Sequence, residues 1–119
     1  MEIINFIKKE NVEAGIALHP KINILEYEEL FTLVDQIIVM TVTPGFGGQK
    51  FIESQVKKIE DLYNLRKTKN YRFKISADGG IDEISGKKCI KSGVDILAVG
   101  SFLLSKPETE FDKIIDSFK

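Results

Sequence analysis

The chain has 119 residues, is 43% hydrophobic and 29% charged, and carries a formal net charge of −1. These values fit one small globular domain over residues 1–119 and provide no basic surface for nucleic acid or an anionic membrane. One cysteine, Cys89, excludes an internal disulfide and fits a reducing cytoplasm, and its helical context predicts a small buried apolar side chain. No apolar run approaches the ~20 residues of a membrane span, and the mixed charges of residues 1–10 are not those of a signal peptide.

The first third of the chain predicts a helix over residues 2–9 and a short buried strand at 15–18, which His19 and Pro20 end. A helix is predicted over residues 24–33, with three leucines available for burial: Leu25, Leu30 and Leu33. The β-branched run at 36–42 is the strongest strand signal.

The remainder predicts a long helix over 53–67, strands over 72–77 and 94–99, and a helix over 82–91 that contains Gly86. The long helix has one apolar stripe: Val56, Ile59, Leu62 and Tyr63. The spacing of Ser105 and Glu108 matches a capping box that opens a last helix. The apolar face of that helix comprises Phe111, Ile114, Ile115 and Phe118.

Alternating strands and helices with apolar strands predict a parallel sheet covered by helices, an α/β fold. The pattern alone fits an open doubly wound sheet as well as a fragment of a barrel. A complete eight-stranded (β/α) barrel takes roughly 250 residues. This chain therefore has room for about half of one.

Three of the predicted strands run directly into glycine. The strand at 36–42 leads to Thr43-Pro44-Gly45-Phe46-Gly47-Gly48-Gln49, the strand at 72–77 to Asp78-Gly79-Gly80, and the strand at 94–99 to Gly100-Ser101. Glycine lets bare backbone N–H groups approach an anion, although each junction alone could be a tight turn. Because parallel strands end at one sheet edge, the three junctions together predict a shared anion site.

The segment from Val39 to Gln49 resembles the signature of ribulose-phosphate 3-epimerases, and Asp78-Gly79-Gly80-Ile81 and Val99-Gly100-Ser101 follow in the family order. The resemblance runs from about residue 3 to residue 118. It implies a TIM barrel, here its C-terminal half with about four parallel strands and covering helices. In such barrels a phosphate site forms from the loops after strands seven and eight and a short extra helix, which Ser101–Leu104 could supply.

The resemblance also implies roles for individual residues. Asp78 matches the family aspartate that ligates a divalent metal ion (of the Zn, Fe, Mn or Co class) and transfers a proton; without the resemblance it could simply cap the next turn. The substrate- or phosphate-binding positions of the family match the following residues: Met40, Gly45, Phe46, Gly47, Gly48, Gly79, Gly80, Gly100 and Ser101. Met40 could equally be a core methionine, and Thr41 and Thr43 could be ordinary strand formers.

The other polar residues are predicted to have structural roles or to lie at the surface. His19, the only histidine, stands where the family uses no histidine ligand, and Lys21 reads as a solvated loop lysine. Surface or turn positions are expected for five aspartates: Asp35, Asp61, Asp82, Asp95 and Asp112.

This sequence departs from the family in one large respect. Three of the family's four metal ligands and the family's second proton-transferring aspartate lie in the N-terminal half of the barrel, which this sequence does not match. We therefore expect the chain alone to hold a metal weakly and to catalyse little. Two alternatives remain for function: a non-catalytic phosphate-binding or interaction fragment, and an epimerase of a related sugar phosphate such as allulose 6-phosphate. Open sheet edges predict pairing with an identical chain or with an N-terminal half.

Overall fold

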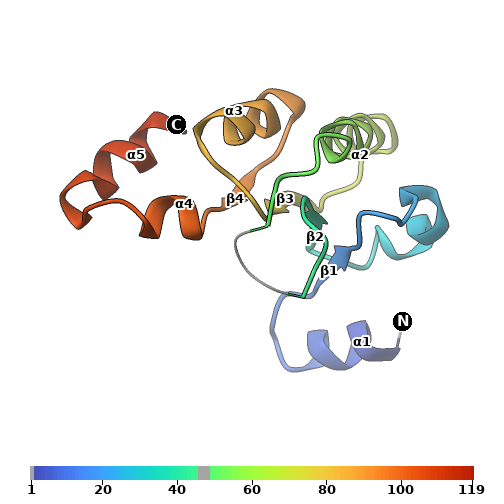
Figure 1. Ribbon diagram of the computed structural model, residues 1–119. Helices are drawn as coiled ribbons and strands as arrows, with labels where there is room; N and C mark the ends of the chain where they lie inside the picture. The colour runs from blue at the N-terminus through green and yellow to red at the C-terminus, as the bar shows by residue number, and fades with distance from the viewer. Residues whose placement is uncertain (1, 46–48) are drawn as a thin grey trace.

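A computed structural model describes residues 2–45 and 49–119 of the chain (Figure 1). Strands and helices alternate along most of the chain, as predicted. Their bounds in chain order are α1 Glu2–Lys9, β1 Gly15–Leu18, the 3-10 helix η1 Ile24–Leu30, β2 Gln36–Met40, α2 Gln55–Lys69, β3 Lys74–Asp78, α3 Glu83–Ser92, β4 Ile96–Ala98, α4 Ser101–Leu104, η2 Glu108–Glu110 and α5 Phe111–Ser117. None of the described helices is long and apolar enough to cross a membrane.

The strands form one sheet in the order β1-β2-β3-β4, and every neighbouring pair is parallel. The predicted α/β class with about four parallel strands and covering helices is therefore confirmed. Order and direction are those of four successive βα units of a barrel, in which each strand lies beside the preceding one.

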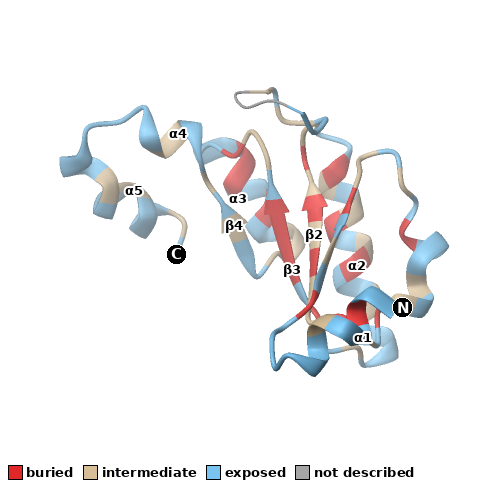
Figure 2. Cartoon of the chain, turned by 90° about the horizontal axis from the view of Figure 1, so that it is seen from below, coloured by how far each residue is buried: buried red, intermediate tan, exposed pale blue. Residues whose placement is uncertain are grey.

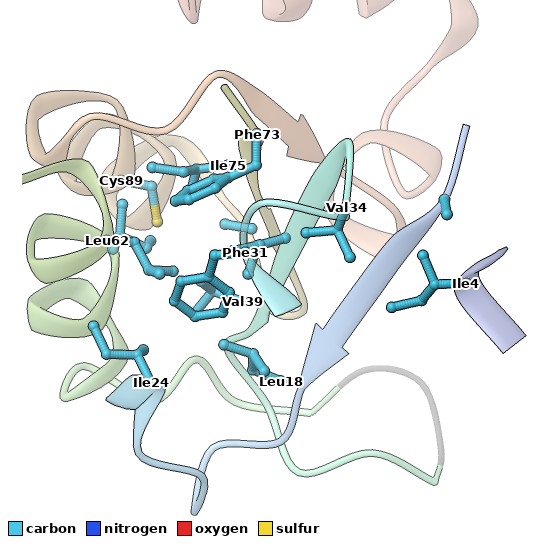
Figure 3. Close-up of a cluster of buried hydrophobic side chains, with 14 of the residues drawn as sticks. Ile4, Leu18, Ile24, Phe31, Val34, Val39, Leu62, Phe73, Ile75 and Cys89 are labelled. Carbon is cyan, nitrogen blue, oxygen red and sulfur yellow. The ribbon is translucent and has the colours of Figure 1, made fainter. Parts of the chain in front are cut away.

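One face of the sheet carries the core (Figures 2 and 3). Ile37 and Val39 of β2 and Ile75 and Ala77 of β3 have no exposed surface. They pack with side chains from the helices that cover this face, among them Ile59 and Leu62 of α2 and Cys89 of α3. Burial of Cys89 confirms that it is a small core residue.

Side chains alternate along a strand, so the other face carries the intervening residues. The register aligns Ala17, Ile38, Ser76 and Ile96 in one row across all four strands. Ala17 and Ile96 are exposed, Ile38 is half-buried and Ser76 is buried, so this face is less covered than the core face, above all at its outer strands. We call it the bare face of the sheet.

Two carboxylates fix the base of the sheet. The N–H of Asp35, just before β2, donates to the Ala14 carbonyl at 2.7 Å, and the Asp35 Oδ2 accepts the Ala14 N–H at 2.8 Å. Asp95, just before β4, does the same with Ile75, whose N–H donates to Asp95 Oδ2 at 2.8 Å. Arg66 reaches the same Oδ2 at 2.6 Å. The sequence prediction treated both aspartates as surface or turn residues and missed these contacts.

Several local predictions were wrong. In β1 only Leu18 is buried, because this strand lies at the sheet edge. The 24–33 segment is a 3-10 helix with a kink at Tyr27, so Ile24 and Phe31 enter the core while Leu25 is 63% exposed. The α-helical spacing on which that prediction rested does not apply there.

The capping box at Ser105 does not form. The Ser105 hydroxyl donates to the Phe102 carbonyl, and the turn η2 precedes α5 without a side-chain cap. Tyr63 and Ile115 also lie more exposed than their predicted apolar faces require. α5 has no buried residue, since it packs against few other elements at the end of the chain (Figure 2).

Candidate functional site

The carboxyl ends of β2, β3 and β4 meet at one edge of the sheet. Met40 is in register with Asp78, and Asp78 with Ala98. Asp78 is the last residue of β3 and is exposed, and it lies on the bare face beside Met40. The helix that follows is capped by Asp82, whose Oδ1 accepts the Ser85 N–H at 2.8 Å. Asp78 is therefore not needed as that cap.

Gly79 and Gly80 adopt backbone angles that favour glycine, with φ of +122° and +65°. A Cβ at Gly79 would lie 2.4 Å from the Val42 side chain, and one at Gly80 would lie 2.8 Å from the Phe51 nitrogen. The loop after β3 thus packs directly against the loop after β2. Only residues without a side chain allow this approach.

Thr41 holds these loops together. It is fully buried, and its hydroxyl donates to the Gly79 carbonyl at 2.5 Å. Its N–H donates to the Asp78 carbonyl at 2.9 Å, and its own carbonyl accepts from the Ile52 N–H at 2.7 Å. The sequence prediction missed this residue, since a threonine at a strand end is an ordinary strand former.

A cleft of about 560 Å³ opens beside these loops. Gly80 and Ser101 line it together, so the structure brings the loops after β3 and β4 to one place. Lys50 also lines the cleft and is exposed. Gly100 precedes α4, and a Cβ there would meet no atom within 4 Å, which leaves open space above the loop.

Other predicted site residues are placed only in part. Gly45 has φ of +133° and open space around it. Phe46, Gly47 and Gly48 lie outside the described residues.

Negative charge also reaches the cleft wall. Asp82 and Glu53 line it, and Lys88 pairs with Glu53 at 2.8 Å. The N–H of Ser85 holds the pKa of Asp82 below its usual range, so Asp82 is ionised at neutral pH. Asp82 would therefore repel an anion that comes close to it.

No metal centre is assembled by the residues at 2–45 and 49–119. Within these ranges, no three His, Cys, Asp or Glu side chains gather closely enough to hold an ion. Asp78 alone does not provide the four ligands of a typical zinc-like site. His19 instead shapes its loop, since its Nδ1 accepts the Lys21 N–H at 3.1 Å and its carbonyl accepts from Lys58 at 3.2 Å.

The fold defines a fragment of a TIM-barrel enzyme, with glycine-containing loops at the carboxyl ends of the strands. A family model described as the ribulose-phosphate 3 epimerase family matches residues 1–104. The chain belongs to the ribulose-phosphate 3-epimerase family.

Individual relatives agree. The chloroplastic ribulose-5-phosphate-3-epimerase of Arabidopsis thaliana is 41% identical over 98 residues, which are 82% of this chain and 35% of the relative. Ribulose-phosphate 3-epimerase of Chlamydia muridarum is 40% identical over 107 residues, which are 88% of this chain and 47% of the relative. The Bacillus subtilis protein of the same name is 36% identical over 99 residues, which are 82% of this chain and 46% of the relative. The chain thus spans about half the length, or less, of these curated relatives.

Proposed function

We propose that this chain supplies the phosphate-binding loops and one proton-transferring carboxylate of a ribulose-phosphate 3-epimerase site. The observation that supports the proposal is one sheet edge at which β3 ends in Asp78 and the Gly79–Gly80 loop, with Gly80 and Ser101 lining one cleft beside it. The substrate would be D-ribulose 5-phosphate, which the pentose phosphate pathway interconverts with D-xylulose 5-phosphate. A cytoplasmic location is part of the proposal and fits a single, buried cysteine.

The loops would bind the phosphate through backbone N–H groups. Gly79, Gly80 and Gly100 present main chain without side chains, and Ser101 adds a hydroxyl. Gly45 and the adjoining Phe46, Gly47 and Gly48 are proposed to close over the sugar, and Met40 to line the pocket beside Asp78. Anchoring the phosphate would hold the carbon next to the carbonyl near the carboxylate.

Asp78 would exchange a proton with one face of that carbon. Epimerisation removes a proton from one face of C3 and returns a proton to the other, so a second acid/base group must lie opposite. In the family, that second group and most ligands of the divalent metal belong to the N-terminal half. The described residues of this chain do not supply a metal site. We propose that turnover requires an N-terminal half and that any metal affinity of this chain alone is weak.

The first test is phosphate binding. Titration of the ¹⁵N-labelled chain with inorganic phosphate should shift the amide signals of Gly79, Gly80, Gly100 and Ser101. Ser101→Asp should abolish these shifts by repulsion, while the fold tolerates an acidic residue in the first turn of α4. Ser117→Asp, at an exposed serine of α5, is the matched control and should bind as the parent does. Unmoved loop signals at high phosphate would refute this site.

The second test is turnover of D-ribulose 5-phosphate. The chain alone should show negligible activity, and a mixture with the N-terminal half of the Bacillus subtilis relative should gain activity. Asp78→Asn should remove that gain, because the amide cannot take the proton. Undiminished activity of the Asp78→Asn mixture would exclude Asp78 from proton transfer.

A further inference from the structure

The two faces of the sheet are covered very differently. α2 and α3 lie against one face, where Ile37, Val39, Ile75 and Ala77 are fully buried. On the bare face Ala17 and Ile96 are exposed and Ile38 and Met40 are half-buried, and only Ser76 of its central row is buried. All-parallel sheets occur almost only with both faces covered. The bare face therefore has the character of an interface.

In the part of the chain that the structure describes, the two outer strands of the sheet, β1 and β4, each have an unpaired edge. Within the described parts of the chain, β1 pairs only with β2, and β4 pairs only with β3. Each outer strand therefore presents one row of backbone groups to another strand. Such rows readily pair with a further chain.

The exposed area is too large for a closed monomer. The chain exposes 7879 Å². A folded monomer of its mass of 13.4 kDa exposes about 6,500 Å² by the usual scaling, so the excess is about 1,400 Å². Its radius of gyration is 14.9 Å, compared with about 13.5 Å for a compact domain of this length. A standard interface buries about 800 Å² per partner. The excess is larger than this, although part of it comes from side chains exposed on the helices, such as Phe6 and Leu104.

We propose that a second copy of this chain covers the bare face. A twofold axis parallel to the strands would place β4 of each copy beside β1 of the other. Because all four strands are parallel, both new contacts would also be parallel, and eight strands would close without a free edge. Two copies also have about the length of one complete barrel, since the matched part of one copy spans 46–47% of the two bacterial relatives named above.

The row across the bare face suits such a closed interior. Ala17, Ile38, Ser76 and Ile96 alternate small and large side chains in one register. Barrel interiors are filled by layers of side chains from alternate strands. Two copies of the row would supply side chains to such layers, with Asp78 of each copy at one mouth. This inference concerns association alone and goes beyond the proposed function.

Sedimentation equilibrium of the intact chain tests the proposal. At tens of micromolar, the chain should behave as a dimer. Ile38→Glu should weaken dimerisation by more than about tenfold, because it places a charge in the centre of the buried layer. Ile84→Glu is the matched control, because Ile84 is 70% exposed on α3, away from the bare face, and should leave the dimer unchanged.

A cross-link tests the arrangement even if Ile38→Glu fails to fold. β1 and β4 lie three strand spacings apart in one copy, about 14 Å, which exceeds the reach of a disulfide. The shear of a TIM barrel displaces each new β4–β1 contact by about four residues along the strands, so Ile96 would face Glu13 of the other copy. The double variant Glu13→Cys, Ile96→Cys should therefore form covalent dimers on oxidation, while either single variant should not. Native Cys89 should not interfere, because burial raises its pKa to about 11.

A monomer at these concentrations would overturn the inference, and so would assemblies larger than a dimer, because a closed eight-stranded barrel has no edge left. Failure of the double variant to cross-link would overturn the twofold arrangement. A monomer that binds phosphate at Gly79 and Ser101 would refute the second copy and leave the proposed function intact.

Discussion

Replacing Thr41 with valine would remove one hydroxyl from the junction of two loops while keeping the shape of the side chain. The Thr41 hydroxyl donates to the Gly79 carbonyl at 2.5 Å from a fully buried position. In the variant, that carbonyl would lose its donor in a place where water replaces it poorly. We expect the free energy of unfolding to fall by about 1–3 kcal/mol.

The same substitution should weaken phosphate binding, since Gly79 would no longer be held against the loop after β2. Thr41→Ser is the matched control, because it keeps the hydroxyl and deletes one methyl group. That deletion should cost about 1 kcal/mol of stability and leave phosphate affinity close to that of the parent.

Urea unfolding and phosphate titration by NMR measure the two effects separately. The reasoning requires Thr41→Val, but not Thr41→Ser, to lose phosphate affinity. If both variants bound phosphate equally, the hydroxyl would have no part in positioning Gly79. If Thr41→Val were as stable as the parent, the hydrogen bond to Gly79 would contribute nothing measurable.

Three further outcomes are expected. Gly86→Ala should loosen α5, because the new Cβ would lie 2.5 Å from Cε1 of Phe118. Adding Phe118→Ala should relieve the clash. Equal protease sensitivity of α5 in the parent and in Gly86→Ala would contradict this prediction. Asp82→Ala should cost about 0.5–2 kcal/mol at pH 7 through loss of the α3 cap. Because the folded-state pKa of Asp82 is lowered, its ionic contribution exists above about pH 4 and disappears as the pH falls through the folded value, so urea midpoints of parent and variant should converge in acid. Iodoacetamide should modify Cys89 slowly at pH 8 in the folded chain and rapidly in urea, since burial raises its pKa to about 11. Equal rates would contradict this prediction and show that α3 opens readily.

Much of the sheet was predictable because its strands have simple patterns. β2 and β3 are bounded by polar or glycine-rich segments and carry β-branched residues, and the structure places both within two residues of their predicted limits. The sequence also predicted special backbone at the glycine junctions, since Gly79 and Gly80 do adopt positive φ values. The roles of Asp78 and of the phosphate loops remain predictions.

The failures have physical causes as well. The 24–33 segment has apolar residues that suit an α-helix, but tertiary packing selects Ile24 and Phe31 for the core and leaves Leu25 in solvent. The contact of Thr41 with Gly79 joins residues 38 positions apart, so no local spacing could predict it. Arg66 and Asp95 pair across 29 positions for the same reason.

The carboxylates of Asp35 and Asp95 have a consequence for how the strands find their alignment. Each binds the main chain of the strand that precedes it in the sheet, at the same place relative to the pair, so β1–β2 and β3–β4 use one device twice. A slip of one residue would break that amide contact and turn Ile37 and Val39, or Ile75 and Ala77, away from the helices. Alignment within each pair is thus specified by residues of the pair itself. The register of these two pairs therefore does not depend on a partner at the bare face.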